Sequence, residues 1–303
     1  MTTPETTPET TPEITLTYRR DPTTPGLVLP PGACDTHVHV FGPAARFPFA
    51  ATRNFTPADA PKETLFALHR QLGIERCVIV QSAVHGMDNA ATEDAIAHGG
   101  GRYLGVALVP LSVGDAELAR LASVGFRGVR FNFMKHLAAA GGVDEIVAFT
   151  RRLAPLGLHL QVHFDSSLIH GLAGPLAQSA VPVVIDHIGR VDAGLGPAHE
   201  DFAALRALLR NPLFRVKVSG IDRISRPLPP HDYADGVALA RLLVDEFADR
   251  CLWGSDWPHP NHTHVPDDGA LVDAIARIAP DAAVREQLLV RNPQDFYRFE
   301  ATA

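Results

Sequence analysis

Two histidines separated by one residue, His37 and His39, are the side chains whose spacing points most directly to chemistry. They belong to a short apolar run, residues 33–40, that is typical of a β-strand. Because side chains two positions apart on a strand share one face, about 6.6 Å apart at ~3.3 Å per residue, both imidazoles can converge on one metal ion or one substrate. Asp35 has the same parity and could orient an imidazole from behind. A strand whose two histidines merely face a polar loop is the alternative.

Polar side chains also follow most of the other apolar runs of the sequence. If stability alone determined the sequence, titratable groups would not concentrate at one end of nearly every run. We therefore interpret them as parts of one functional site. The set comprises Gln81, Ser82, Arg130, Asn132, His163, Asp165, Asp186, His187, Arg190, Asp222, Arg223, Asp256 and His259.

The elements that would position these side chains are short apolar runs that alternate with amphipathic stretches. The apolar runs are residues 34–40, 77–81, 103–109, 128–133, 158–164, 181–187, 214–219 and 251–255. Helix-like spacing is found in residues 62–72, 88–98, 115–124, 144–156, 168–179, 199–209 and 233–247, and again after residue 267. Alternating strands and helices imply parallel strands joined by right-handed crossovers. Eight such units predict a closed (β/α)8 TIM barrel, a single domain over residues 26–303.

Composition narrows the class of protein further. The first twelve residues repeat a Thr-Thr-Pro-Glu unit with almost nothing apolar, so we predict a disordered amino-terminal tail over residues 1–25. The net charge of −7 gives no support for nucleic-acid binding. A stretch of about 18 apolar residues and a secretion signal are both missing, which argues against membrane insertion and favours the cytoplasm. The three cysteines, Cys34, Cys77 and Cys251, lie in or beside apolar runs and are expected to be buried.

The motifs at the ends of these runs resemble the amidohydrolase superfamily. Within it, the chain is similar to the branch of 2-pyrone-4,6-dicarboxylate lactonases and related sugar-acid and muconolactone lactonases. Together the matching segments span nearly everything after the tail. They are Cys34-Asp-Thr-His-Val-His-Val-Phe-Gly-Pro43 with Arg46-Phe-Pro-Phe49, Arg127-Gly-Val-Arg-Phe-Asn-Phe133, Asp186-His-Ile-Gly-Arg190 and Trp253-Gly-Ser-Asp-Trp-Pro-His-Pro-Asn261.

The resemblance implies roles for individual side chains. Asp256 would be the base that activates the hydrolytic water. His37, His39 and His187 would hold or polarise the lactone carbonyl. Arg130, Arg190 and Arg223 match positions that bind substrate carboxylates, which suits a planar, always charged guanidinium, although Arg223 in a loop could instead form a surface ion pair. The remaining substrate-binding candidates are Gln81, Ser82, Asn132 and His259.

Four departures from the pyrone lactonase pattern bear on substrate and metal. His136 replaces a carboxylate-binding arginine and Phe55 a substrate-contacting tyrosine, and the loop after residue 218 is shorter than in that branch. His163 stands where the metal-free pyrone lactonase carries a tyrosine. With His163 the chain has the pattern of amidohydrolases that bind one metal ion.

The predicted cofactor is therefore one divalent ion, zinc or manganese, which leaves a position for water. A metal-free mechanism remains the alternative. Asn132, rather than a carboxylate, ends the fourth run, which disfavours a second metal. The predicted ligands are His37, His39, His163 and Asp256.

We expect a hydrolase that opens a small lactone bearing at least one carboxylate. The rival with the same site is a metal-dependent decarboxylase of an unsaturated or aromatic acid. A rival of another class is a non-catalytic protein that binds small acids, which would need no base at Asp256. The expected partner is a small carboxylated molecule, and no signal in the sequence predicts an oligomeric state.

Overall fold

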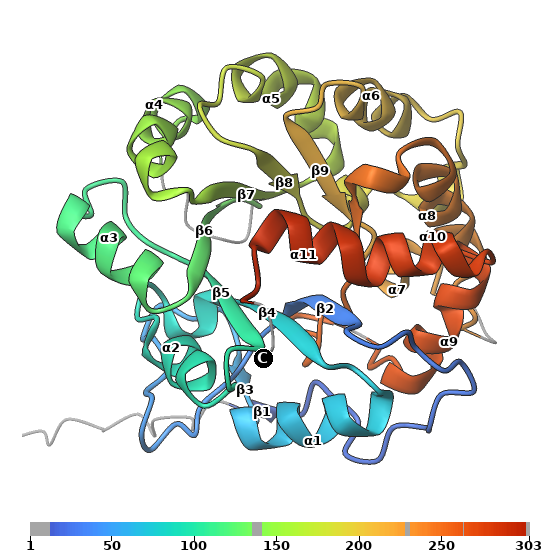
Figure 1. Ribbon diagram of the computed structural model, residues 1–303, viewed down its shortest axis with the longest axis horizontal. Helices are drawn as coiled ribbons and strands as arrows, with labels where there is room; N and C mark the ends of the chain where they lie inside the picture. Colours follow the sequence, from blue (N-terminus) through green and yellow to red (C-terminus); the bar gives the residue numbers. More distant parts are fainter. Residues whose placement is uncertain (1–12, 135–140, 228–230, 263, 301–303) are drawn as a thin grey trace, which may run out of the picture.

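The computed structural model describes residues 13–134, 141–227, 231–262 and 264–300. Eight parallel strands form one sheet in the order β10-β9-β8-β7-β6-β5-β4-β2. The sheet closes because the Thr36 amide donates to the Trp253 carbonyl at 2.9 Å and the Asp256 amide donates to the His37 carbonyl at 2.8 Å. The strands surround a central axis with helices outside them (Figure 1). The predicted (β/α)8 barrel is confirmed.

Each barrel strand lies within or beside a predicted apolar run, and most are shorter than the run at their carboxyl end. Side chains on both faces of these strands are mostly buried, as expected for a parallel sheet covered by helices. The strands are β2 (Cys34–Val38), β4 (Arg76–Val80), β5 (Tyr103–Ala107), β6 (Phe126–Phe133), β7 (His159–Phe164), β8 (Val183–Ile185), β9 (Phe214–Lys217) and β10 (Cys251–Leu252).

Every predicted helical stretch contains a helix on the outside of the barrel (Figure 1). In the first of them, Leu65, Leu68 and Leu72 are buried, which is the face that the apolar spacing predicts. The outer helices are α1 (Lys62–Leu72), α2 (Ala90–Ala97), α3 (Asp115–Ser123), α4 (Val143–Leu153), α5 (Ile169–Leu176), α6 (Glu200–Leu209), α8 (Ala234–Glu246) and α9 (Asp268–Ile278). None of the described helices is long and apolar enough to cross a membrane.

The segment before the barrel differs from the prediction of a disordered tail through residue 25. Strand β1 (Ile14–Thr15) pairs with β3 (Thr56–Pro57). The Tyr18 ring packs edge-on against Trp257, with centroids 5.3 Å apart. The Thr23 hydroxyl donates to Asp267 at 2.7 Å. Residues 13–25 find partners in distant parts of the chain, which composition alone does not reveal. Residues 1–12 lie outside the described part.

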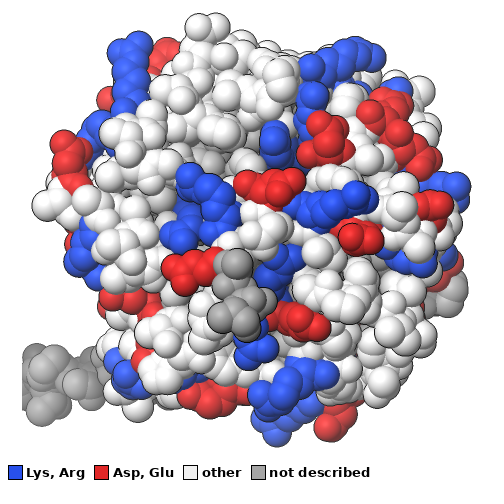
Figure 2. All heavy atoms as spheres, in the orientation of Figure 1, with Lys and Arg blue, Asp and Glu red and all other residues white. Residues whose placement is uncertain are grey.

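The two ends of the barrel are built differently. The end where the strands begin is crossed by α11 (Asn292–Tyr297), which follows α10 (Ala282–Glu286) (Figure 1). Basic and acidic side chains are interspersed on this face (Figure 2). Loops after the strands form the other end, including the short helix α7 (Ile221–Ile224) after β9. The three cysteines are buried and unpaired, as predicted.

Candidate active site

A cavity at the carboxyl ends of the strands brings together most of the predicted site residues. Active sites of (β/α)8 enzymes lie at this end, because the loops that follow the strands converge there. Asn54 and Asn261 join two of these loops at the cavity through a hydrogen bond of 3.1 Å between their side chains. The predicted residues that line the cavity are His39, Ser82, Arg130, His163, His187, Arg190, Arg223 and Asp256, and Phe55 lines it as well.

The carboxylate of Asp256 is the centre of this arrangement. Its Oδ1 lies 3.2 Å from His39 Nε2, 3.6 Å from His37 Nε2 and 3.7 Å from His187 Nε2. Its Oδ2 accepts a close hydrogen bond from Arg223 Nε. Burial alone would raise the pKa of Asp256, but Arg223 and the surrounding imidazoles hold it well below its usual range. The carboxylate is therefore charged, and Arg223 is held at the site and not in a surface ion pair.

The tautomer of His39 follows from its hydrogen bond to the backbone. Its Nδ1 lies 2.7 Å from the Val80 carbonyl oxygen, which can only accept. Nδ1 therefore carries a proton, and in the neutral ring the lone pair of Nε2 faces the Asp256 carboxylate. Two acceptors at 3.2 Å repel each other unless a proton or a cation lies between them.

His37 is fully buried between the site and the interior of the barrel. Burial, with a further contribution from Lys217, lowers the pKa of His37 to about 3, so the ring is neutral. Its Nδ1 lies 3.3 Å from Asp186 Oδ1. Asp186 also accepts from Arg130 Nε at 2.8 Å and from Gln161 at 3.2 Å. His37 is thus held from behind by an acidic group, a common arrangement for metal-binding histidines.

Three of the four predicted metal ligands lie close enough to share one ion. One ligand atom each from His37, His39 and Asp256 fall within 4.8 Å of one another, and all three residues are buried. Two imidazoles and an ionised carboxylate are a donor set that suits zinc or manganese. The described residues therefore fit a divalent cation.

The fourth predicted ligand, His163, does not fall within this group. Its ring lies beside that of His187, with centroids 5.3 Å apart. Both of its ring nitrogens are buried without a hydrogen-bond partner among the described residues. Burial, with a smaller effect of Arg130, holds the pKa of His163 well below its usual value. The ring is therefore neutral, with an unused lone pair.

Three guanidinium groups surround the same cavity. Arg130 is already paired with Asp186, and Arg223 with Asp256. The Nη2 atom of Arg223 is nevertheless buried without a partner among the described residues. Burial and the neighbouring Arg223 lower the pKa of Arg190, whereas the carboxylates of Asp256, Asp222 and Asp165 raise it. An anionic ligand would stabilise the charged form of a guanidinium that is buried beside another guanidinium.

Three predicted substrate-binding residues do not line the cavity. Gln81 is held by Thr92 at 2.7 Å and by the Asp88 carbonyl at 2.8 Å, so it organises the loop after β4. His259 is buried against Asp268 at 3.0 Å, and this contact raises its pKa although burial opposes the rise. Asn132 is buried opposite His163 in the neighbouring strand. His136, one of the departures described above, lies outside the described residues.

One charged residue at the site, Lys217, was not predicted from the sequence. Lys217 ends β9, is fully buried, and lies 3.3 Å from His37 Nδ1. The signal was present in the run Phe214-Arg-Val-Lys217, because a lysine within a buried strand points to a polar partner inside the barrel.

Comparison with known proteins identifies the family. The model of the amidohydrolase family matches residues 34–299. The chain belongs to the amidohydrolase family. It is 44% identical over 290 residues to a 2-pyrone-4,6-dicarboxylate hydrolase of Comamonas testosteroni, a match that covers 93% of this chain and 95% of that one. It is also 41% identical to a 4-sulfomuconolactone hydrolase of Hydrogenophaga intermedia, with 89% and 90% covered.

Solved structures agree with this assignment. A protein of Acinetobacter baumannii, assigned as a 2-pyrone-4,6-dicarboxylic acid hydrolase and crystallised with citric acid, superposes with a TM-score of 0.79. It is 26% identical, and the match covers 88% of this chain and all of that one. The prediction of a lactonase-like hydrolase of the amidohydrolase superfamily is confirmed.

Proposed function

We propose that this protein opens a small anionic lactone by attack of water on the ring carbonyl, with Asp256 as the base. The observation that carries the proposal is the juxtaposition at Asp256: a buried carboxylate, three imidazoles within 3.7 Å and cationic side chains on the wall of one cavity. A cationic wall recognises an anionic substrate, and an ionised carboxylate can accept a proton from water.

In the proposed reaction Asp256 accepts one proton from water as the water oxygen bonds to the carbonyl carbon. The ring carbon–oxygen bond then breaks, and the departing ring oxygen takes up the proton from Asp256, so that one water is consumed and a carboxylic acid and a hydroxyl or enol result. The carboxylic acid then releases its proton to solvent as a carboxylate. His187 Nδ1 lies 3.0 Å from the Ser219 hydroxyl, which can donate to it. In that tautomer Nε2–H is free to donate to the carbonyl oxygen.

A divalent cation fits the same site and would be held by His37, His39 and Asp256. When bound, it would polarise the carbonyl and acidify the attacking water. His163, whose ring nitrogens have no partner among the described residues, is the proposed fourth ligand. Elemental analysis of the purified protein should find about one equivalent of zinc or manganese, and His163→Tyr should lower that content. Full activity in protein shown to be metal-free would contradict this part of the proposal.

Two curated relatives are named for anionic lactones, a pyrone dicarboxylate and a sulfonated muconolactone. Their names support the substrate class proposed here, and the arginines give it a physical basis. Arg130, Arg190 and Arg223 can each present two parallel N–H groups to a carboxylate or sulfonate.

The proposal is tested by incubating the purified protein separately with 2-pyrone-4,6-dicarboxylate and with 4-sulfomuconolactone. Ring opening is followed by ultraviolet absorbance, and the product by mass spectrometry. We expect a product heavier than the substrate by one water for at least one of the two lactones. A product lighter by one carbon dioxide would instead establish decarboxylation, and binding of both compounds without turnover would establish a non-catalytic acid-binding protein.

A further inference from the structure

Lys217 lies under the candidate site and has no part in the chemistry proposed above. Its Nζ donates to the Thr36 carbonyl at 2.8 Å and lies 3.3 Å from His37 Nδ1. Asp186 Oδ1 lies at the same distance, 3.3 Å, from that nitrogen and 3.9 Å from Lys217 Nζ. One imidazole nitrogen therefore faces a cation and an anion at equal distance.

These two neighbours favour opposite tautomers of His37. A carboxylate can only accept, so Asp186 favours a proton on Nδ1 and leaves a lone pair on Nε2. An ammonium can only donate, so Lys217 favours an unprotonated Nδ1 and a proton on Nε2. A neutral imidazole carries its proton on one ring nitrogen and not on both, so the two tautomers exclude each other.

The position of that proton matters at Asp256. His37 Nε2 lies 3.6 Å from Asp256 Oδ1, and His39 Nε2 lies 3.2 Å from the same oxygen. Without a cation, a proton on His37 Nε2 is attracted to the Asp256 carboxylate, whereas a lone pair on that nitrogen is repelled by it. With a cation bound, Nε2 must supply a lone pair to the ion.

We propose that Lys217 and Asp186 are a positioning pair that lets the ring proton of His37 change nitrogen. Lys217 stabilises the Nε2–H form in the cation-free protein, and Asp186 stabilises the Nδ1–H form when a divalent cation binds. The exchange moves the one ring proton of His37 from one nitrogen to the other and releases none. The inference builds on the proposed site, but it is tested without substrate or turnover.

The test uses the full-length protein with nitrogen-15-labelled histidine, because the imidazole nitrogen shifts distinguish the two tautomers. His37→Gln identifies the His37 signals by their loss. In the wild-type protein we expect Nε2–H without metal and Nδ1–H after one equivalent of zinc. Lys217→Met, which keeps an unbranched chain and removes the ammonium, should show Nδ1–H in both states. It should also bind zinc about tenfold more tightly, measured by competition with a chelator.

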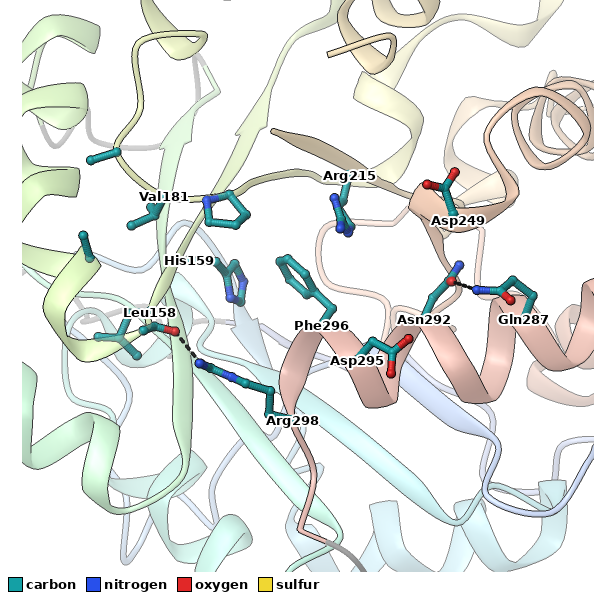
Figure 3. A pocket seen from close by; sticks show the side chains of 14 residues that line it. Leu158, His159, Val181, Arg215, Asp249, Gln287, Asn292, Asp295, Phe296 and Arg298 are labelled. Carbon is teal, nitrogen blue, oxygen red and sulfur yellow. Dashed lines mark hydrogen bonds between the residues drawn. The ribbon is translucent and has the colours of Figure 1, made fainter. Parts of the chain in front are cut away.

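Arg215→Met is the matched control. Arg215 lies two residues before Lys217 on the same strand, but it lines the cavity at the opposite end of the barrel (Figure 3). Loss of this cation should leave the His37 tautomer and the zinc affinity unchanged.

Two results would overturn the inference: a His37 tautomer that is the same with and without zinc, or a metal-free Lys217→Met protein that keeps Nε2–H. If Lys217→Met does not fold, the wild-type pair of spectra decides alone. Tautomer exchange in a protein that opens neither lactone would refute the proposed function and leave this inference standing.

Discussion

The barrel has a cavity at each end, and the larger one is not the one that carries the candidate chemistry. The cavity at the start of the strands has a volume of about 560 Å³, against about 90 Å³ for the cavity beside Asp256. Figure 3 shows His159, Arg215 and Phe296 in the larger cavity. Each cavity is lined by histidine, arginine and aspartate, so neither size nor residue type separates them.

The two cavities differ in whether the polar groups have partners. In the larger one, Arg215 donates to the Pro212 carbonyl at 3.3 Å and its guanidinium lies 5.1 Å from the centre of the Phe296 ring. His159 Nε2 has no partner among the described residues, but its ring packs against aromatic rings and not against a carboxylate. At the carboxyl ends, by contrast, unpartnered nitrogens of His163 and Arg223 surround an ionised Asp256. Convergent unsatisfied groups, more than volume, distinguish a site for chemistry.

The largest expected effect comes from exchanging an aspartate at each end. Asp256→Asn should lower kcat by about 10² to 10⁴-fold, because it removes the proposed base and keeps the volume. Asp249→Asn, in the larger cavity, should leave kcat and KM within about twofold of the wild type. Steady-state kinetics on the lactone that proves to be the substrate measures both. Comparable losses of kcat in the two variants would mean that the chemistry cannot be assigned to the cavity beside Asp256 alone.

A second effect concerns stability at the carboxyl end. Arg130→Met would leave Asp186 charged and buried without its 2.8 Å partner, which should lower the free energy of unfolding by roughly 3–5 kcal/mol. Adding Asp186→Asn removes the uncompensated charge and should restore part of that loss. Urea denaturation of the single variant, the double variant and the wild type measures these free energies of unfolding. An Arg130→Met protein as stable as the wild type would mean that Arg130 binds substrate and does not stabilise the fold.

A third effect separates recognition of the anion from chemistry. Arg190→Met should raise KM for a carboxylated lactone by roughly 10- to 100-fold with a smaller change in kcat, since a hydrogen bond to a charged group contributes about 1.5–3 kcal/mol. The ester analogue of the same lactone should lose much less. Arg298→Met, at the other cavity, is the control and should leave KM unchanged for both the acid and its ester. Equal losses for the acid and its ester would show that Arg190 is structural.

The sequence predicted the barrel and the location of its site, but not the partners of the site residues. Strand–helix alternation is a local, periodic signal, and the polar residues at the strand ends mark the functional end of the barrel. Partners are not local: Arg130 pairs with Asp186 and Arg223 with Asp256, 56 and 33 residues away along the chain. Sequence alone therefore predicted these arginines as substrate-binding residues, with an ion pair as the alternative for Arg223, but it did not identify the carboxylate that each of them contacts.

The same limit explains the residues placed away from the cavity. His259 follows Asp256 closely and was expected to bind substrate, but Asp268 at the start of α9 holds it inside the protein. Gln81 ends an apolar run as the site residues do, yet its side chain is used by the following loop. A position at a strand end predicts proximity to the site, whereas the direction of the side chain depends on partners that only the fold brings together.

The smallest expected effect uses His159, whose pKa burial lowers to about 3 from an ordinary 6.5. Because the unfolded chain binds the proton more tightly, this residue favours the folded state above pH 6.5, and that contribution is lost as the pH falls from 6.5 towards 3. His159→Asn should therefore reduce the loss of stability between pH 7.5 and pH 5 by about 2 kcal/mol, while kcat/KM at pH 7.5 stays within about twofold of the wild type. Urea denaturation at the two pH values gives the difference, which is insensitive to any packing defect that acts equally at both. An undiminished acid sensitivity would show that His159 is already protonated in the folded protein, and a large loss of kcat/KM would mean that the two ends of the barrel are coupled.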